Sequence, residues 1–204
     1  MEISEYLSDP CKASSLPYWK TKTVEIPGNI RIIRDDLLSA SSYNGVDEPY
    51  FKLMHDLKSV REVILPEGYE MTQCSEDTYA QHINSCYTRE HISADYLLAR
   101  KSLPVSQPDL WIAVKDISNG QIVATGIAEL DADIGEGILE WIQVSPEYRR
   151  NGLGAFIVCE LLRRMQGRAQ FATVSGRMTN ETSPFSLYRE CGFTNPVIWH
   201  IITT

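Results

Sequence analysis

The sequence predicts an α/β (α+β) fold in which a mainly antiparallel sheet is flanked by helices. Two observations predict it. From about residue 67 the chain alternates strand-like and helix-like segments in the order β-α-α-β-β-β-α-β-α-β, and the three consecutive strands are joined by short turns. Short turns join antiparallel neighbours, whereas a helix between two strands allows a crossover. The 204 residues suffice for one ordinary domain with a small addition.

The elements after residue 65 are predicted from local patterns. Ser75 and Ser93 stand where N-caps are favoured, so a helix should begin after each. The helix at 152–166 carries one apolar stripe at helical spacing, and Gly167 provides its C-terminal stop. The full set is a strand at 69–73, helices at 75–87 and 93–101, strands at 110–115, 121–130 and 138–144, a helix at 152–166, a strand at 171–175, a short helix at 184–190 and a strand at 193–202.

Residues 1–64 are interpreted as an N-terminal extension of unknown role, and residues 65–204 as the main domain. Within the extension, Pro27-Gly28-Asn29 lies between two β-branched runs, which predicts a hairpin. The segment EPYFKLMHDLKSVRE, residues 48–62, is predicted to form a short helix.

Composition excludes several classes of function. A net charge of −8 and a pI near 5.0 argue against a nucleic-acid partner, because phosphate binding favours a basic surface. The acidity serves solubility, with a cationic small substrate as the alternative. No run approaches the ~18 apolar residues of a membrane span, and the N-terminus lacks a signal-peptide pattern. The five scattered cysteines form no CxxC pair, so we expect free thiols, no metal and a cytoplasmic location.

The stretch RRNGLGAF, residues 149–156, has the composition of an anion site at a helix start. The first N–H groups of a helix lack partners and carry partial positive charge, and glycines let a phosphate approach them. A Walker A loop is excluded, because no lysine follows Gly154. A dinucleotide-binding fingerprint is disfavoured by Ile157 at its third glycine position and by the three strands that precede it.

The same stretch resembles a signature of the GNAT superfamily of acyl-CoA-dependent N-acetyltransferases, Q/R-x-x-G-x-G/A, at residues 149–154. NETSPFSLYRECGF at 180–193 resembles the second signature of this family, and LPEGYEMTQCSED at 65–77 resembles its first strand and helix. The resemblance covers residues 65–204 and implies a GNAT-like mixed, mainly antiparallel twisted sheet flanked by helices, with an N-terminal extension. One departure is that Asn180 lies eight residues before Tyr188, where many members have seven.

The resemblance implies acetyl-CoA as the acyl donor, with no metal. The loop at the start of the helix would hold the pyrophosphate through backbone N–H groups, and the preceding strand would bond the pantetheine arm. The eight-residue spacing before Tyr188 sets Asn180 apart from the other positions implied for cofactor binding. The positions implied for cofactor binding are Ile142, Gln143, Val144, Arg149, Arg150, Asn151, Gly152, Leu153, Gly154, Ala155 and Asn180.

Two catalytic residues are expected. Tyr188 matches the tyrosine that, in the family, donates a proton to the coenzyme A sulfur. Glu140 is the favoured base, because alternation along the strand would place it on the face of Ile142 and Val144. The alternatives for Glu140 are a solvated or substrate-orienting carboxylate, with water as the base. The amide of Val144 would polarise the thioester carbonyl.

Other polar candidates rank lower. We expect His82 and His91 to be exposed or to cap helices, although both lie in the helical pair that would border the substrate site. Cys159 and Cys191 are expected to be buried packing residues, because no histidine is placed to activate them.

The sequence therefore predicts an N-acetyltransferase that moves an acetyl group to a primary amine by direct attack through a tetrahedral intermediate. The alternatives are a non-catalytic acyl-CoA-binding module of the same fold and a nucleotide-dependent oxidoreductase. A small-molecule amine is favoured over a protein acceptor, since residues 1–64 would cover the acceptor groove. A homodimer through the apolar last strand, VIWHIITT, is a further expectation.

Overall fold

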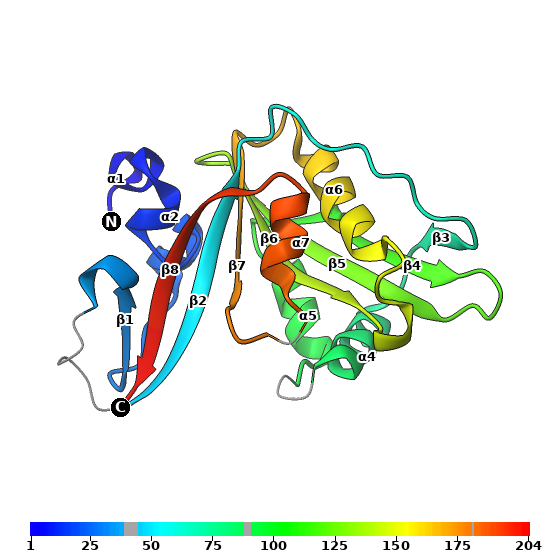
Figure 1. The fold of residues 1–204 in the computed structure, drawn as a ribbon, viewed down its shortest axis with the longest axis horizontal. Helices are drawn as coiled ribbons and strands as arrows, with labels where there is room; N and C mark the ends of the chain where they lie inside the picture. Colours follow the sequence, from blue (N-terminus) through cyan, green and yellow to red (C-terminus); the bar gives the residue numbers. More distant parts are fainter. Residues whose placement is uncertain (39–44, 88–90, 181) are drawn as a thin grey trace.

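The computed structural model describes residues 1–38, 45–87, 91–180 and 182–204. Over these residues eight strands form one sheet in the order β1-β8-β2-β7-β6-β5-β4-β3, and helices lie on both of its faces (Figure 1). The strands are β1 (Ile30–Arg34), β2 (Val46–His55), β3 (Tyr69–Thr72), β4 (Ser106–Asp116), β5 (Ile122–Asp131), β6 (Glu136–Val144), β7 (Phe171–Arg177) and β8 (Thr194–Thr203). The helices are α1 (Ile3–Ser8), α2 (Pro10–Ala13), α3 (Tyr18–Thr23), α4 (Glu76–Cys86), α5 (Ala94–Lys101), α6 (Leu153–Met165) and α7 (Pro184–Glu190).

The predicted fold class and the element order after residue 65 are confirmed. All pairings in the sheet are antiparallel except that of β6 with β7, which the crossover through α6 makes parallel. The two predicted N-caps are also present. Ser75 Oγ accepts from the amide of Thr78 at 3.3 Å, and Ser93 Oγ accepts from the amide of Tyr96 at 3.1 Å.

Two predictions about the N-terminal part are wrong. The segment expected to be a helix at 48–62 contributes most of β2, and residues 56–62 that follow it are not helical. β2 is paired on both sides, with β7 and β8. Its buried residues, Phe51, Lys52, Leu53 and His55, include polar side chains, so its sequence lacks clean alternation. The expected hairpin is absent, since residues 18–23 form α3 and β1 pairs with β8 instead.

The position of β2 also changes how the two halves of the chain relate. β2 lies inside the sheet, so the sheet contains strands from both sides of residue 65. The division into an extension (residues 1–64) and an acetyltransferase domain (residues 65–204) stays a prediction. β2 pairs along one edge of β8, and β1 pairs with residues 199–203 along the other edge. β1 therefore occupies most of the edge of VIWHIITT on which the expected homodimer depended, and the homodimer stays a prediction.

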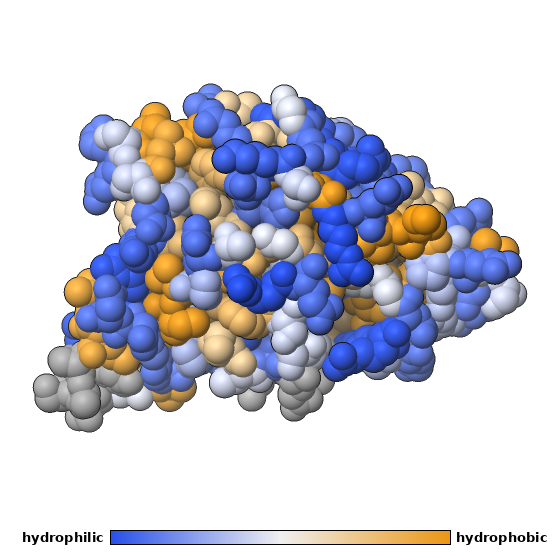
Figure 2. All heavy atoms as spheres, turned by 45° about the horizontal axis from the view of Figure 1, so that its top comes forward, coloured by the Kyte–Doolittle hydropathy of each residue, from blue (hydrophilic) through white to orange (hydrophobic). Residues whose placement is uncertain are grey.

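The two faces of the sheet have separate cores. On the first face α6 packs on β4, β5 and β6, around buried residues that include Ile112, Ala124 and Leu139. On the second face α4 and α5 pack over a smaller cluster that includes Trp111 and Ile127. On the face that Figure 2 shows, hydrophilic residues predominate and hydrophobic residues gather in separate areas.

The N-terminal helices are tied to the second face of the sheet. The carboxylate of Glu136 accepts hydrogen bonds from the Tyr6 hydroxyl at 2.7 Å and from the Tyr18 amide at 3.0 Å. Buried Lys52 on β2 donates to the Tyr6 hydroxyl and to three backbone carbonyls of residues 10–16. These contacts hold α1, α2 and α3 against β6 and β2.

Strands β6 and β7 separate part of the way along their length. Their parallel pairing runs from Glu136 opposite Phe171 to Leu139 opposite Val174. Beyond this point β6 continues to Val144 and β7 to Arg177, without pairing to each other. The gap that opens there positions the candidate site.

Candidate active site

A cleft of about 640 Å³ lies where β6 and β7 separate. Its walls are the end of β6, the loop and first turn of α6, the residues that lead into α7, and α7 itself. This volume is within the range of pockets that hold a small molecule or cofactor. Most of the predicted site residues line it, namely Ile142, Gln143, Val144, Arg149, Arg150, Gly152, Gly154, Ala155 and Tyr188.

The start of α6 supplies a cradle for an anion. Among the described residues, the backbone N–H groups of residues 150–155 have no hydrogen-bond partner. Arg150 and Gly152 have left-handed backbones, with φ of 67° and 82°, which turns the chain sharply from β6 into the helix. Unpaired N–H groups at a helix N-terminus, next to two arginines, are suited to an anion such as a phosphate.

Gly154 provides a close approach between α6 and α7. A Cβ atom at this position would lie 3.2 Å from Leu187 Cδ2 and 3.8 Å from Val144 Cγ2. A side chain at residue 154 would therefore press on Leu187 of α7, whereas its contact with Val144 would be an ordinary one.

The edge of β6 that faces the cleft is open. The amide of Ser145 donates to the carbonyl of Val123 at 2.9 Å, so Ser145 points its polar groups toward β5. Because successive residues of an antiparallel strand point these groups to opposite sides, Ile142 and Val144 point theirs away from β5. Pairing with β7 has already ended at Leu139, so the polar groups of Ile142 and Val144 face the cleft.

Side chains from two other elements bind the carbonyls of this edge. The Tyr87 hydroxyl lies 3.4 Å from the Ile142 carbonyl, and Arg149 Nε donates to the Val144 carbonyl at 3.1 Å. The amides of Ile142 and Val144 remain as donors toward the cleft. An unpaired strand edge of this kind can bond an extended ligand as if it were another strand.

Tyr188 lies on α7 in the wall of the cleft. Its side chain is only 6% exposed, and its ring packs against Phe51 and Phe193 at centroid distances of 6.1 and 5.6 Å. Burial, and then the nearby Tyr87, raise the pKa of Tyr188, so its hydroxyl stays protonated at neutral pH. No hydrogen bond of this hydroxyl is found within the described ranges, and Tyr188 lines the cleft, so the hydroxyl can donate to a ligand there.

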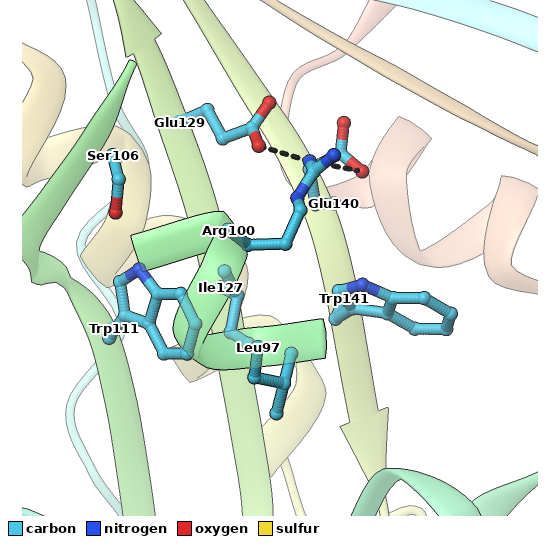
Figure 3. Close-up of a pocket in the computed structure, with 8 residues that line it drawn as sticks. All are labelled: Leu97, Arg100, Ser106, Trp111, Ile127, Glu129, Glu140 and Trp141. Carbon is cyan, nitrogen blue, oxygen red and sulfur yellow. Dashed lines mark hydrogen bonds and ion pairs between the residues drawn. The ribbon is translucent and has the colours of Figure 1, made fainter. Parts of the chain in front are cut away.

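Glu140 does not share the face of Ile142 and Val144, contrary to the prediction. Ile127 of β5 lies opposite Trp141, while Ala128 lies opposite Leu139, so Glu140 is the extra residue of a β-bulge. The bulge turns Glu140 toward the second face of the sheet. There its carboxylate pairs with Lys20 and lies 3.4 Å from the Arg100 guanidinium (Figure 3).

Three other predicted site residues lie apart from the cleft wall. Leu153 is buried in the core under α6, and Asn151 and Asn180 are not among the described residues that line the cleft. Asn180 Oδ1 accepts from the amide and hydroxyl of Thr182 at 2.9 and 2.8 Å. Its side chain therefore forms hydrogen bonds within the turn before α7.

His82 is buried and connects α4 to the strands, rather than being exposed or capping a helix. Its Nδ1 lies 2.9 Å from Thr125 Oγ1, and its Nε2 lies 3.0 Å from Ser145 Oγ. Burial lowers the pKa of His82 to about 4, so the imidazole is neutral at physiological pH. His91 is exposed, and Cys159 and Cys191 are buried, all three as expected.

The sequence analysis missed several residues of the cleft. Thr182, Ser183 and Ser186 line it beside α7, and Cys86 and Tyr87 line it from the end of α4. The hydroxyl-rich run TSPFS at the start of α7 was the available signal for the first three. No local signal marks Cys86 and Tyr87, because the fold alone brings the end of α4 to the cleft.

Two searches of the described part of the chain were negative. It holds no group of three or more His, Cys, Asp or Glu side chains that could bind a metal ion. Within the same ranges, no helix has both the length and the apolar composition needed to cross a membrane.

Comparisons with solved structures give the same fold. A GCN5-related N-acetyltransferase from Sphaerobacter thermophilus superposes with a TM-score of 0.70 at 18% identity, over 84% of this chain and 58% of that one. A tandem GNAT protein from the clavulanic acid biosynthesis pathway gives 0.62 at 14% identity, over 86% and 63%. The ribosomal-protein-S18-alanine N-acetyltransferase from Escherichia coli gives 0.51 at 17% identity, over 66% and 93%. This chain thus spans less than two thirds of the first two proteins.

The comparison with family models identifies the central part of the chain. No curated protein sequence matches it. Residues 106–195 match the model described as an acetyltransferase (GNAT) domain, and this range contains the cradle, the open edge of β6 and Tyr188. Residues 106–195 are therefore similar to a GNAT acetyltransferase domain, and the solved structures above share the fold of this chain.

Proposed function

We propose that the protein is an N-acetyltransferase that transfers an acetyl group from acetyl-CoA to a primary amine, by direct attack through a tetrahedral intermediate. The observation that carries this proposal is that one cleft contains three features, each suited to a different part of acetyl-CoA. These are the unpaired N–H groups at the start of α6, the open edge of β6 and the unpartnered hydroxyl of Tyr188.

The residues present fit acetyl-CoA as the acyl donor. The N–H groups of residues 150–155, with Arg149 and Arg150, suit the pyrophosphate. The amides of Ile142 and Val144 suit the pantetheine arm and the thioester carbonyl. Since these two amides have no partner in the described part of the chain, a bound extended chain would satisfy donors that the fold leaves open.

In the proposed reaction the amine nitrogen forms a bond to the thioester carbonyl carbon, and the carbon–sulfur bond then breaks. The amide of Val144 stabilises the oxygen that becomes negative, and Tyr188 gives its proton to the departing sulfur. The attacking amine loses a proton to a base. Glu140 remains our proposal for that base, with water as the alternative, and it would act from the second face of the sheet.

We also propose a small-molecule amine as acceptor, in the cytoplasm. Support for a small acceptor comes from α3, whose Lys20 and Trp19 cover the second face next to Glu140 and Glu129 and leave little room for a protein segment. A homodimer stays a prediction, which light scattering can test.

The test is coenzyme A release from acetyl-CoA over a panel of polyamines, amino acids, aminoglycosides and peptides. Tyr188→Phe should lower kcat by roughly a hundredfold and leave the Kd of acetyl-CoA unchanged, because only the proton donor is lost. Tyr79→Phe is the matched control, since Tyr79 is equally buried but packs against Trp111 away from the cleft.

The outcomes separate the alternatives. Binding of acetyl-CoA without turnover of any amine would favour the non-catalytic binding module. Thermal stabilisation by NAD(P) with none by acetyl-CoA would favour the oxidoreductase and overturn the proposal.

A further inference from the structure

A compact group of charged and aromatic side chains lies on the second face of the sheet, at the bulge of β6. Glu129 of β5 accepts from Trp19 Nε1 at 3.0 Å and pairs with Arg100, and Glu140 of β6 pairs with Lys20. Arg100 also lies 3.4 Å from Glu140, so it bridges the two carboxylates (Figure 3). We call these five residues the bulge cluster.

The bulge is what brings the two carboxylates together. Glu129 lies opposite Ile138 in the register of β5 and β6, on the same face as Ile127. The extra residue in β6 turns Glu140 to that face as well, beside Glu129. The Glu129 and Glu140 side chains are only 5% and 15% exposed, so two anions share a site with little water.

Two carboxylates as close as those of Glu129 and Glu140 both remain ionised only if cations lie beside them. Burial and the charge of Glu140 raise the pKa of Glu129 to about 7, against the opposing effect of Arg100. Arg100 supplies one permanent charge from α5. The second charge is the primary alkylammonium of Lys20, which comes from the short helix α3 and lies 5.6 Å from the ring centroid of Trp19.

The wall beside the cluster also contains polar groups with no partner. A cavity of about 10 Å³, large enough for one water molecule, is lined by cluster residues together with Trp141 and Ser106. Trp141 Nε1 and Ser106 Oγ are buried atoms without a hydrogen-bond partner in the described part of the chain. A polar ligand next to Glu140 could satisfy groups that the protein itself leaves unbonded.

The cluster lies at the gap that also forms the cleft. Glu140 is the first residue of β6 past its last pairing with β7, and Ile142, two residues on, faces the cleft. The two carboxylates are on the second face of the sheet, and the acyl-donor cleft begins two residues beyond Glu140 on β6. An amine held by Glu140 would therefore stand at the gap through which it must meet a thioester.

We propose that Glu129 and Glu140 form the subsite for the ammonium group of the acceptor, that the acceptor is a small primary alkylamine, and that Lys20 occupies this subsite as an internal mimic that the acceptor displaces. This inference rests on the proposed function. It assigns to the N-terminal segment a role in selecting the acceptor, since α3 carries both Lys20 and Trp19.

The test replaces the mimic and measures acceptor binding and turnover separately. Lys20→Met keeps the length of the side chain and removes its charge, so the KM for n-butylamine should fall about tenfold, with the KM for acetyl-CoA unchanged. Lys22→Met is the matched control, because Lys22 lies on the same helix but contacts the ring of Tyr18 instead. Its KM values should equal those of the wild type. Lys20→Gln replaces Lys20→Met if the latter fails to fold by circular dichroism.

A binding measurement makes failure of this inference distinguishable from failure of the proposed function. Calorimetry without acetyl-CoA should show n-butylamine binding about tenfold more tightly to Lys20→Met than to the wild type. That gain should disappear in Lys20→Met/Glu140→Gln. If acetyl-CoA turnover is absent but this pattern holds, the proposed function fails and the subsite stands. An acceptor KM and Kd that are unchanged or weakened in Lys20→Met overturn the inference.

Discussion

Arg149 Nε donates a hydrogen bond to the carbonyl oxygen of Val144 at 3.1 Å, so the first residue of the cradle also holds the last residue of β6. Arg149→Met removes this bond and one positive charge from the cleft. We expect the Kd for acetyl-CoA to rise about tenfold, as for the loss of a charge-assisted contact, with a smaller effect on kcat. Calorimetry measures the change. Arg163→Met is the control, because Arg163 pairs with Glu160 on the exposed side of α6, and equal effects of the two variants would contradict the role of Arg149.

Gly152 and Gly167 flank α6 with similar left-handed backbones, φ 82° and 75°. Alanine at either position should lower the free energy of unfolding by about 1–2 kcal/mol, because L-residues are strained in this region. Only Gly152→Ala should also weaken acetyl-CoA binding, since Gly152 lines the cleft whereas a Cβ at Gly167 meets nothing within 4 Å. Denaturant unfolding and calorimetry separate the two effects. A loss of binding in Gly167→Ala would show that strain, rather than the cradle, controls the affinity.

His82 should make stability depend on pH in a defined direction. Its folded pKa of about 4 lies below the ordinary 6.5, so between these values the unfolded chain binds more protons than the folded one. Stability from this residue is therefore fully present above pH 6.5 and falls as the pH is lowered toward 4, by about 3 kcal/mol.

The measurement is urea unfolding of the wild type and His82→Gln at pH 7 and pH 4.5. Glu129, whose pKa is raised, contributes with the opposite sign, so the difference between the two proteins isolates His82. The stability gap between the wild type and the variant should shrink or reverse at the lower pH. A gap that does not change with pH would mean that His82 is not held neutral.

Lys52 should hold the N-terminal helices on the sheet. Its Nζ donates to the Tyr6 hydroxyl and to the carbonyls of Pro10, Ser14 and Leu16, with Lys52 itself 1% exposed. Lys52→Met leaves these acceptors buried without a donor, so the free energy of unfolding should fall by about 3 kcal/mol.

Limited proteolysis should then cut the Lys52→Met protein within residues 1–24 sooner than the wild type. Lys58→Met is the control, since the Lys58 side chain is 85% exposed. If both variants are as stable and as resistant as the wild type, the buried ammonium does not anchor the helices.

Local sequence was sufficient for the parts of the site that depend on short-range patterns. Gly152 lies in the turn before α6 and Gly154 in its first turn, and Pro184 begins the helix that carries Tyr188. Helices α6 and α7 could therefore be predicted from the sequence. Glu140 shows the limit. Alternation correctly describes an unbroken strand, but whether a bulge interrupts it depends on the register with β5, which no local pattern encodes.

By itself, the sequence determined the order of elements after residue 65, the helix caps and the phosphate-type loop, because these follow from periodicity and from the conformations that glycine, serine and proline favour. Only the tertiary structure decided that β2 lies between β7 and β8, that β1 pairs with the last half of β8, and that Lys20 meets Glu140 across 120 residues of chain. Those outcomes depend on which surfaces bury one another and on which charges must then be paired, and both are set by contacts between residues far apart in the sequence.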